Sequence, residues 1–136
     1  MRATTNFLLV GLGGAIGGGL RYGLSLIPGA SYLAAILAIN IVGAAVLPIV
    51  AHYLLPKYGA SLQTRLLITT GVISSFTTFS AITGAMVEYI QHGQPWRAGT
   101  YLALNLVLGL LAAAAGSYFA QRRARSNPNS QPAARS

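Results

Sequence analysis

The chain is 136 residues long, with 54% hydrophobic and only 7% charged residues. A soluble domain usually carries about a quarter charged residues, so this composition excludes an ordinary water-facing surface and indicates a protein that lies in lipid. Nine Lys and Arg residues stand against one acid, for a net charge of +8. Because the basic residues lie at the ends of apolar runs and not along one polar face, we do not expect a nucleic-acid-binding protein. The absence of cysteine excludes disulfides and thiolate metal sites.

The apolar residues fall into four segments long enough to cross a bilayer, which takes about 20 residues of α-helix. The predicted spans cover about residues 7–27, 32–55, 66–90 and 98–119. We therefore expect an all-α membrane protein with one four-helix transmembrane domain over residues 1–120. Residues 121–136 are basic and rich in Ser, Asn and Pro, a composition that cannot bury apolar surface and predicts a disordered tail.

The basic residues are divided unequally between the two ends of these spans. Four spans place both termini on one side of the membrane. If that side is cytoplasmic, seven basic residues lie inside: Arg2, Lys57, Arg65, Arg122, Arg123, Arg125 and Arg135. The other two, Arg21 and Arg97, lie outside. The positive-inside rule therefore predicts a protein of the cell inner (plasma) membrane with both termini in the cytoplasm.

Several polar side chains fall inside the predicted spans, where they cost free energy unless they find partners or water. Asn40 and Asn105 lie near the middle of the second and fourth spans. Taken alone, such Asn residues are most often hydrogen-bonded between helices, Arg21 would extend to the interface, and the glycines of the first span would allow close packing. The third span has six hydroxyl residues between Ser74 and Thr83. Hydroxyls compete with backbone hydrogen bonds, so we expect a break in this helix.

The residue types that are missing from the spans indicate the charge of the transported species. Cation channels often use rings of Asp or Glu, and proton-coupled transport needs a titratable group at depth. The one acid here, Glu88, lies near the end of the third span. What remains are Arg, Asn, Ser, Thr and Tyr donors and the electropositive edges of Phe rings. They favour a passive anion pathway, and the lack of a nucleophile–base pair or metal cluster argues against an enzyme.

Four motifs, one in each span, resemble the CrcB/Fluc family of fluoride channels. They are Gly13-Gly14-Ala-Ile-Gly17-Gly-Gly-Leu-Arg21-Tyr22, Asn40-Ile-Val-Gly43, Phe76-Thr-Thr-Phe-Ser80 and Tyr101-x-x-x-Asn105-x-x-x-Gly109. The resemblance implies a fluoride-selective channel that exports fluoride passively, protects the cell from its toxicity and assembles as an antiparallel dimer with two narrow pores.

The resemblance also implies roles for individual residues. Asn40 and Phe79 would line the pore, and Arg21 would lie in its aqueous vestibule. The donors that replace the hydration of fluoride would be Asn40, Thr78, Ser80, Tyr101 and Asn105, with the ring edge of Phe79. A structural sodium ion at the dimer centre would be bound by the backbone carbonyls of Ser74 and Thr77.

The chain departs from the family pattern at several positions. Ile82 falls on the second pore Phe and Ile36 on a Thr of the polar track, so we expect one of the two anion routes of a dimer to be impaired. The other departures are Ser74-Ser75 in place of Gly-Gly, Asn105 in place of a Ser, and Ala85 in place of an acid, with Glu88 one turn later.

The unequal distribution of basic residues between the two sides of the membrane indicates which subunit the chain pairs with. An antiparallel dimer of one chain needs copies in both orientations, so its inside and outside charges should balance, and seven against two do not. We hypothesise that the chain pairs with a paralogue of opposite orientation, the alternative being a homodimer. Two other functions compete: a small multidrug-type transporter, whose membrane-embedded carboxylate is missing from the first span, and a structural membrane protein held by its Asn and hydroxyl groups.

Overall fold

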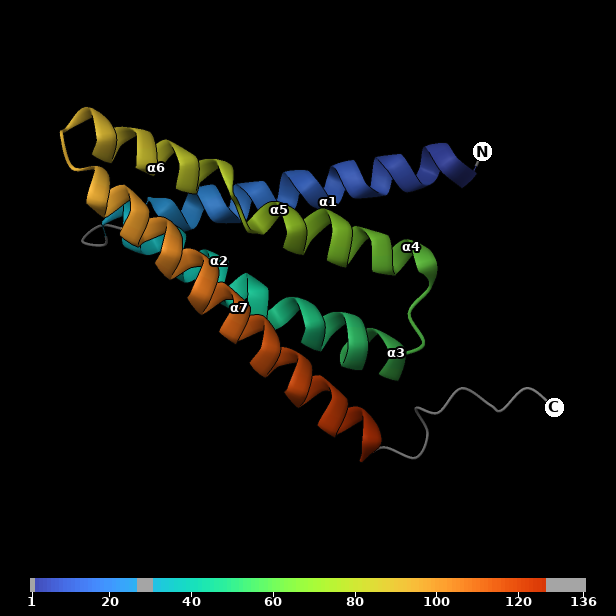
Figure 1. The fold of residues 1–136 in the computed structure, drawn as a ribbon. Coiled ribbons are helices and arrows are strands. Elements are labelled where there is room, and N and C mark those ends of the chain that lie inside the picture. The colour runs from blue at the N-terminus through green and yellow to red at the C-terminus, as the bar shows by residue number, and fades with distance from the viewer. Residues whose placement is uncertain (1, 27–30, 127–136) are drawn as a thin grey trace.

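The computed structural model describes residues 2–26 and 31–126 (Figure 1). Every regular element within these residues is a helix, and none of them forms a strand. Four stretches are long and apolar enough to cross a membrane: Ala3–Ser25, Tyr32–Lys57, Leu62–Gln91 and Pro95–Arg125. The prediction of four spans is therefore confirmed, and the chain is an all-α, multi-pass membrane protein.

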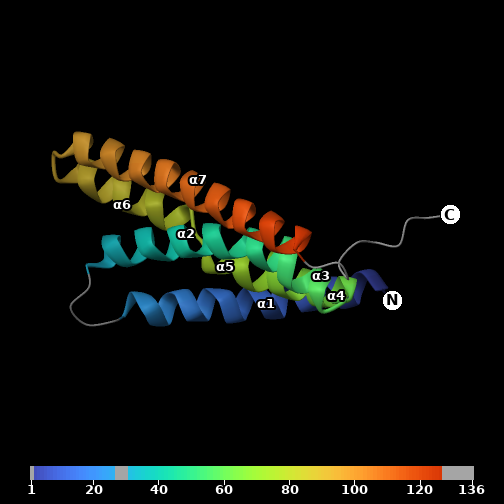
Figure 2. The ribbon, with the colours of Figure 1, turned by 90° about the horizontal axis from the view of Figure 1, so that it is seen from below.

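The spans pack as two pairs. Helix α1 (Arg2–Ser25) lies along the π-helical segment η2 (Leu66–Ile73) and the short helix α5 (Ser74–Phe76). Helix α2 (Tyr32–Ile49) lies along α7 (Pro95–Arg125). Figures 1 and 2 show that α1 begins and α7 ends at the same end of the molecule, as four spans require.

The second and third spans contain further segments. After α2, the second span continues through the π-helical segment η1 (Val50–Leu54) into α3 (Leu55–Lys57). The third span begins with α4 (Leu62–Arg65), where the Ser61 side chain accepts a hydrogen bond from Thr64 N–H and caps the helix. It ends with α6 (Ser80–Gln91), which packs against α7.

Glycines let α1 approach η2 closely. A Cβ on Gly13 would overlap the Leu67 carbonyl oxygen, and one on Gly71 would lie 2.8 Å from the Gly13 Cα. A Cβ on Gly17 would overlap the Val72 carbonyl oxygen. The predicted packing role is thus confirmed for Gly13 and Gly17. At Gly11, Gly18 and Gly19 an added Cβ would meet nothing within 4 Å, so these glycines have no packing role within this chain.

The third span is interrupted between α5 and α6. Thr77 has φ −78° and ψ 153°, an extended conformation that does not continue a helix. On both sides of the interruption, a hydroxyl group bonds to a backbone group that a helix would pair with another backbone group. Thr77 Oγ1 donates to the Ser74 carbonyl at 3.1 Å, and Ala81 N–H donates to Thr78 Oγ1 at 3.2 Å. Hydroxyl side chains therefore take the place of regular helical hydrogen bonds here.

The last helix is longer than its sequence predicts. We expected it to end near residue 119 with a disordered tail from 121, but α7 continues to Arg125. Ala, Gln and Arg are good helix formers, and the Arg residues of the last turn interact favourably with the helix dipole. The Arg123 guanidinium also lies 5.2 Å from the centre of the Phe119 ring. The rest of the expected tail, 127–136, lies outside the described residues.

Candidate ion pathway

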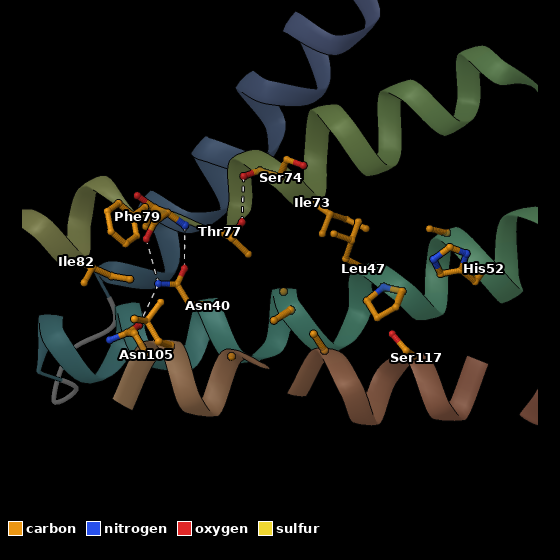
Figure 3. Close-up of a pocket in the computed structure, with 18 residues that line it drawn as sticks. Asn40, Leu47, His52, Ile73, Ser74, Thr77, Phe79, Ile82, Asn105 and Ser117 are labelled. Atoms are coloured by element: carbon orange, nitrogen blue, oxygen red, sulfur yellow. Dashed lines mark hydrogen bonds between the residues drawn. The ribbon is translucent and has the colours of Figure 1, made fainter. Parts of the chain in front are cut away.

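The Asn40 side chain on α2 clamps the interrupted segment of the third span (Figure 3). Its Oδ1 accepts a hydrogen bond from Thr78 N–H at 2.8 Å, and its Nδ2 donates to the Thr78 carbonyl at 3.1 Å. The same Nδ2 donates to Asn105 Oδ1 on α7 at 3.2 Å. One amide thus satisfies both backbone groups of a non-helical residue at bilayer depth, where an unpaired group would cost several kcal/mol.

Gly43, one turn after Asn40, makes this clamp possible. A Cβ on Gly43 would overlap the Thr77 side-chain methyl, so a larger residue would require the Thr77 side chain to shift. The Asn-x-x-Gly spacing therefore has a physical reason: the amide binds the extended backbone, and the glycine on the same helix face leaves room for it.

The polar network continues from Asn105 to Tyr101. Asn105 Nδ2 donates to the Tyr101 carbonyl at 2.9 Å, and the Tyr101 hydroxyl donates to the Leu33 carbonyl on α2 at 2.9 Å. Asn105 is 5% and Tyr101 7% exposed. A phenol has a single hydrogen to donate, so in this structure the Tyr101 hydrogen is used to join α7 to α2.

We expect the variant Tyr101→Phe to lose about 1 kcal/mol of stability, the usual net value of one hydrogen bond, because only the contact to the Leu33 carbonyl is removed. Thermal unfolding in detergent measures this loss, and anion flux in liposomes should stay within about twofold of the parent. Unchanged stability with lost flux would instead mean that the phenol itself reaches the anion.

Thr78 and Ser80 form a second polar group at the start of α6. Their hydroxyl oxygens are 3.0 Å apart, and either can be the donor. Thr78 is buried, whereas Ser80 is exposed. Since the pair uses one hydroxyl hydrogen between its two members, the other hydrogen remains to bind a ligand.

Two cavities adjoin these groups. The larger, about 780 Å³, is bordered by α2, η1, η2, α5, α6 and α7, and Thr78 is among its lining residues. Asn40, Phe79 and Asn105 lie together at one end of it (Figure 3). No acidic residue is among its lining residues. Phe79, the residue just before α6, is 61% exposed, so its ring is free to meet a partner or a ligand.

The smaller cavity, about 450 Å³, lies between α1, the start of α2 and α6. It brings Arg21 together with Ser80, a pairing of a cation and a hydroxyl that suits an anion. Glu88 lines the same cavity, so the single acid of the chain shares a compartment with Arg21. Tyr101 is among the lining residues of neither cavity.

The interruption also leaves two carbonyls without the amide partner of a continuous helix, although the Ser74 carbonyl accepts the Thr77 hydroxyl instead. Thr78 N–H, four residues after Ser74, donates to Asn40, and Ala81 N–H, four residues after Thr77, donates to Thr78 Oγ1. Ser74 and Thr77 both line the larger cavity. Unwound backbone carbonyls of this kind are ligands that a sodium ion accepts.

Some functional contacts have no signature in the sequence. The Leu33 carbonyl accepts a hydrogen bond from the Tyr101 hydroxyl, and the Thr78 backbone binds Asn40. Every residue type has a backbone carbonyl, so the sequence does not show which one serves as the acceptor. The Asn40-Ile-Val-Gly43 motif marked this part of α2 only through its resemblance to the family pattern.

Comparison with known proteins gives a consistent result. The family described as CrcB-like protein, Camphor Resistance (CrcB), matches residues 8–117. The chain is 36% identical over 127 residues to a fluoride-specific ion channel FluC of Hyphomonas neptunium, covering 85% of this chain and 95% of that protein. It is 36% identical over 120 residues to a fluoride-specific ion channel FluC 2 of Listeria innocua, covering 88% and 93%. A fluoride-specific ion channel FluC of Chlorobium phaeobacteroides is 34% identical over 124 residues, covering 89% and 96%. On this evidence the chain belongs to the CrcB-like protein family.

Proposed function

We propose that this chain is a subunit of a fluoride channel, which lets fluoride leave the cell passively and so protects it. The observation that carries the proposal is the interrupted third span, which brings amide and hydroxyl groups at bilayer depth to the edges of two cavities. The relatives named fluoride-specific ion channel support fluoride as the permeant ion. A multidrug-type transporter is disfavoured because the first span has no carboxylate to exchange protons for a cation, and Glu88, the one acid of the chain, lies near the end of the third span.

The hydrogen-bond donors that remain free to bind fluoride are not the ones that the residue types alone suggest. Both Nδ2 hydrogens of Asn40 and the Tyr101 hydroxyl hydrogen are engaged within the protomer. We assign Asn40 the role of positioning the interrupted segment. Fluoride would then meet the spare hydroxyl hydrogen of the Thr78–Ser80 pair and the second Nδ2 hydrogen of Asn105.

Two further features complete the proposed mechanism. Arg21 raises the anion concentration in the smaller cavity, since a positive charge beside low-dielectric walls concentrates counter-ions. The exposed Phe79 ring offers its electropositive edge to the anion at the larger cavity. A narrow passage between these groups would then reject the larger chloride ion by size.

We propose that an antiparallel partner, a second copy or a paralogue, covers the larger cavity. The polar groups on its wall, among them the Thr77 carbonyl, would otherwise face lipid, where unsatisfied polar groups are costly. A sodium ion at the centre of that dimer would be held by the Ser74 and Thr77 carbonyls. Neutral oxygen ligands on a fixed backbone suit such an ion. Its positive charge would stabilise the contact between the interrupted third spans of the two subunits, where backbone carbonyls face one another.

Liposomes that contain the chain together with a partner of opposite orientation test the function. We expect fluoride efflux, followed with a fluoride electrode, to exceed chloride efflux by at least about a hundredfold, since a site shaped for one ion gains several kcal/mol of discrimination. Removal of sodium should lower the fraction of chain cross-linked as dimer. If fluoride leaves neither liposomes that hold the chain alone nor liposomes that hold it with a copy of inverted orientation, the channel proposal is wrong.

The partner can be tested in the same assay. The unequal charge distribution supports a fixed orientation, so we expect little efflux from the chain expressed alone. Co-expression with a copy that carries one added N-terminal span, which inverts its four helices, should restore flux. Robust efflux from the unmodified chain alone would refute the paralogue hypothesis and leave the channel proposal standing.

A further inference from the structure

The larger cavity has polar side chains at both of its ends. Asn40 and Asn105 lie at one end, and His52 and Ser117 lie at the other (Figure 3). Within residues 2–26 and 31–126, neither the His52 ring nor the Ser117 hydroxyl has a hydrogen-bond partner. Polar side chains inside a membrane span usually face a water-filled cavity and mark the path of a substrate or ion. The second polar end therefore calls for a ligand.

The two ends are joined along helices α2 and α7, which run in the same direction. Asn40 Nδ2 bonds Asn105 Oδ1 at 3.2 Å at the first end. His52 follows Asn40, and Ser117 follows Asn105, by the same number of residues, so the second polar pair lies about three helical turns, or about 18 Å, further along both helices. The lining residues between the two pairs include several small ones, which leave space for the cavity: Gly43, Ala44, Ala51, Gly109 and Ala113.

A close contact between α2 and α7 holds Ser117 beside the second polar end. A Cβ on Gly116 would overlap the Ala45 carbonyl oxygen and lie 2.9 Å from Pro48 Cγ, so α7 lies directly against α2 one turn before His52. His52 itself lies in the π-helical segment η1. Short π-helical segments are frequent at functional sites, which supports a role for the side chain that this one carries.

The charged groups at this end of the molecule are basic. The segment η1 packs against α2, α3 and α7. The titratable residues that these elements and η1 itself bring to this end, besides His52, are Tyr53, Lys57, Tyr118, Arg122, Arg123 and Arg125. No acidic residue lines the cavity. An anion near His52 would therefore meet positive charge and no competing carboxylate.

We propose that His52 and Ser117 form a binding site for a small monovalent anion, at the end of the larger cavity that the positive-inside rule places nearer the cytoplasm. A protonated imidazole supplies positive charge and N–H donors, and the hydroxyl supplies one more donor. Because histidine changes its charge between about pH 5 and pH 8, anion binding should strengthen as the pH falls. The inference rests on the proposed function for the identity of the anion as fluoride.

The two histidines of the chain allow a test on the native sequence. His92 lies at the opposite end of the molecule, where Nδ1 is 2.8 Å from the Glu88 carbonyl oxygen, and it is the internal control. The probe is nuclear magnetic resonance of protein with isotope-labelled histidine, with the inverted partner present. We expect about 100 mM fluoride, replacing gluconate at constant ionic strength, to raise the midpoint pH of His52 protonation by about 0.5 unit, as for an anion at about twice its Kd.

The midpoint of His92 should move by less than about 0.1 unit, since no anion site adjoins it. No shift at His52, or equal shifts at both histidines, would overturn the inference. A shift at His52 alone, in a protein that carries no fluoride across liposomes, would support the anion site while refuting the proposed function.

Efflux from liposomes shows whether the site serves conduction. With the same pH on both sides, and with the leak of protein-free liposomes subtracted, we expect fluoride efflux to be about threefold faster at about pH 6 than at about pH 8. His52→Gln in both copies should remove this difference. His52→Arg, whose charge does not titrate in this range, should give the fast rate at both pH values. His92→Gln is the matched control and should keep the parent's pH dependence, whereas a pH dependence that survives His52→Gln would overturn the inference.

Discussion

The variant Asn40→Asp is expected to lose fluoride flux and to unfold at a markedly lower temperature than the parent. Aspartate keeps the acceptor for Thr78 N–H but has no hydrogen for the Thr78 carbonyl or for Asn105 Oδ1. Its carboxylate would face two oxygen atoms at close range in a partly buried site, and an unpaired charge there costs several kcal/mol. The loss therefore comes from a change of one atom without a change of volume.

A second substitution separates charge from hydrogen bonding. Asn40→Ala removes the clamp without adding charge and leaves the Thr78 amide and carbonyl unpaired, at a cost of about 1–3 kcal/mol for each group. Asn6→Asp is the matched control, since Asn6 lies near the start of α1 and makes none of the hydrogen bonds at the interruption. It should change stability by less than about 0.5 kcal/mol. Parent-like stability of Asn40→Asp would contradict the clamp.

The variant Gly17→Ala is expected to have the second-largest effect. Its Cβ would overlap the Val72 carbonyl oxygen and lie 3.1 Å from Phe76 N, and both are backbone atoms that no rotamer change can move. Relief requires α1 and the third span to separate, and overpacking of this kind costs about 1–3 kcal/mol. Because Phe76 directly precedes the extended Thr77, the displacement should also disturb the interruption and lower flux.

Gly18→Ala is the control, on the same helix and one residue away. Nothing lies within 4 Å of a Cβ at Gly18, so the substitution should be neutral or should stabilise α1 by up to about 1 kcal/mol through helix propensity. Thermal unfolding in detergent and fluoride efflux in liposomes measure both variants. Equal effects of the two substitutions would mean that α1 does not pack on η2 through Gly17.

Several properties follow from the sequence by itself. The four spans follow from the length and apolarity of four segments, because lipid requires each crossing to satisfy its own backbone. The glycines of the first span predicted a close helix contact, which the structure shows at Gly13 and Gly17. The motifs in each span pointed to the family that the comparisons establish.

The tertiary structure decided which groups remain free to bind. Residue type does not tell that Asn40 donates both hydrogens within the protomer, or that the Tyr101 hydroxyl is bound to Leu33, because each partner is remote in the sequence and mostly backbone. Nor does it tell that Ile36 and Ile82, from two different spans, meet in one buried cluster. Local patterns fix the face that a residue occupies on its helix, whereas its partners depend on how distant helices pack.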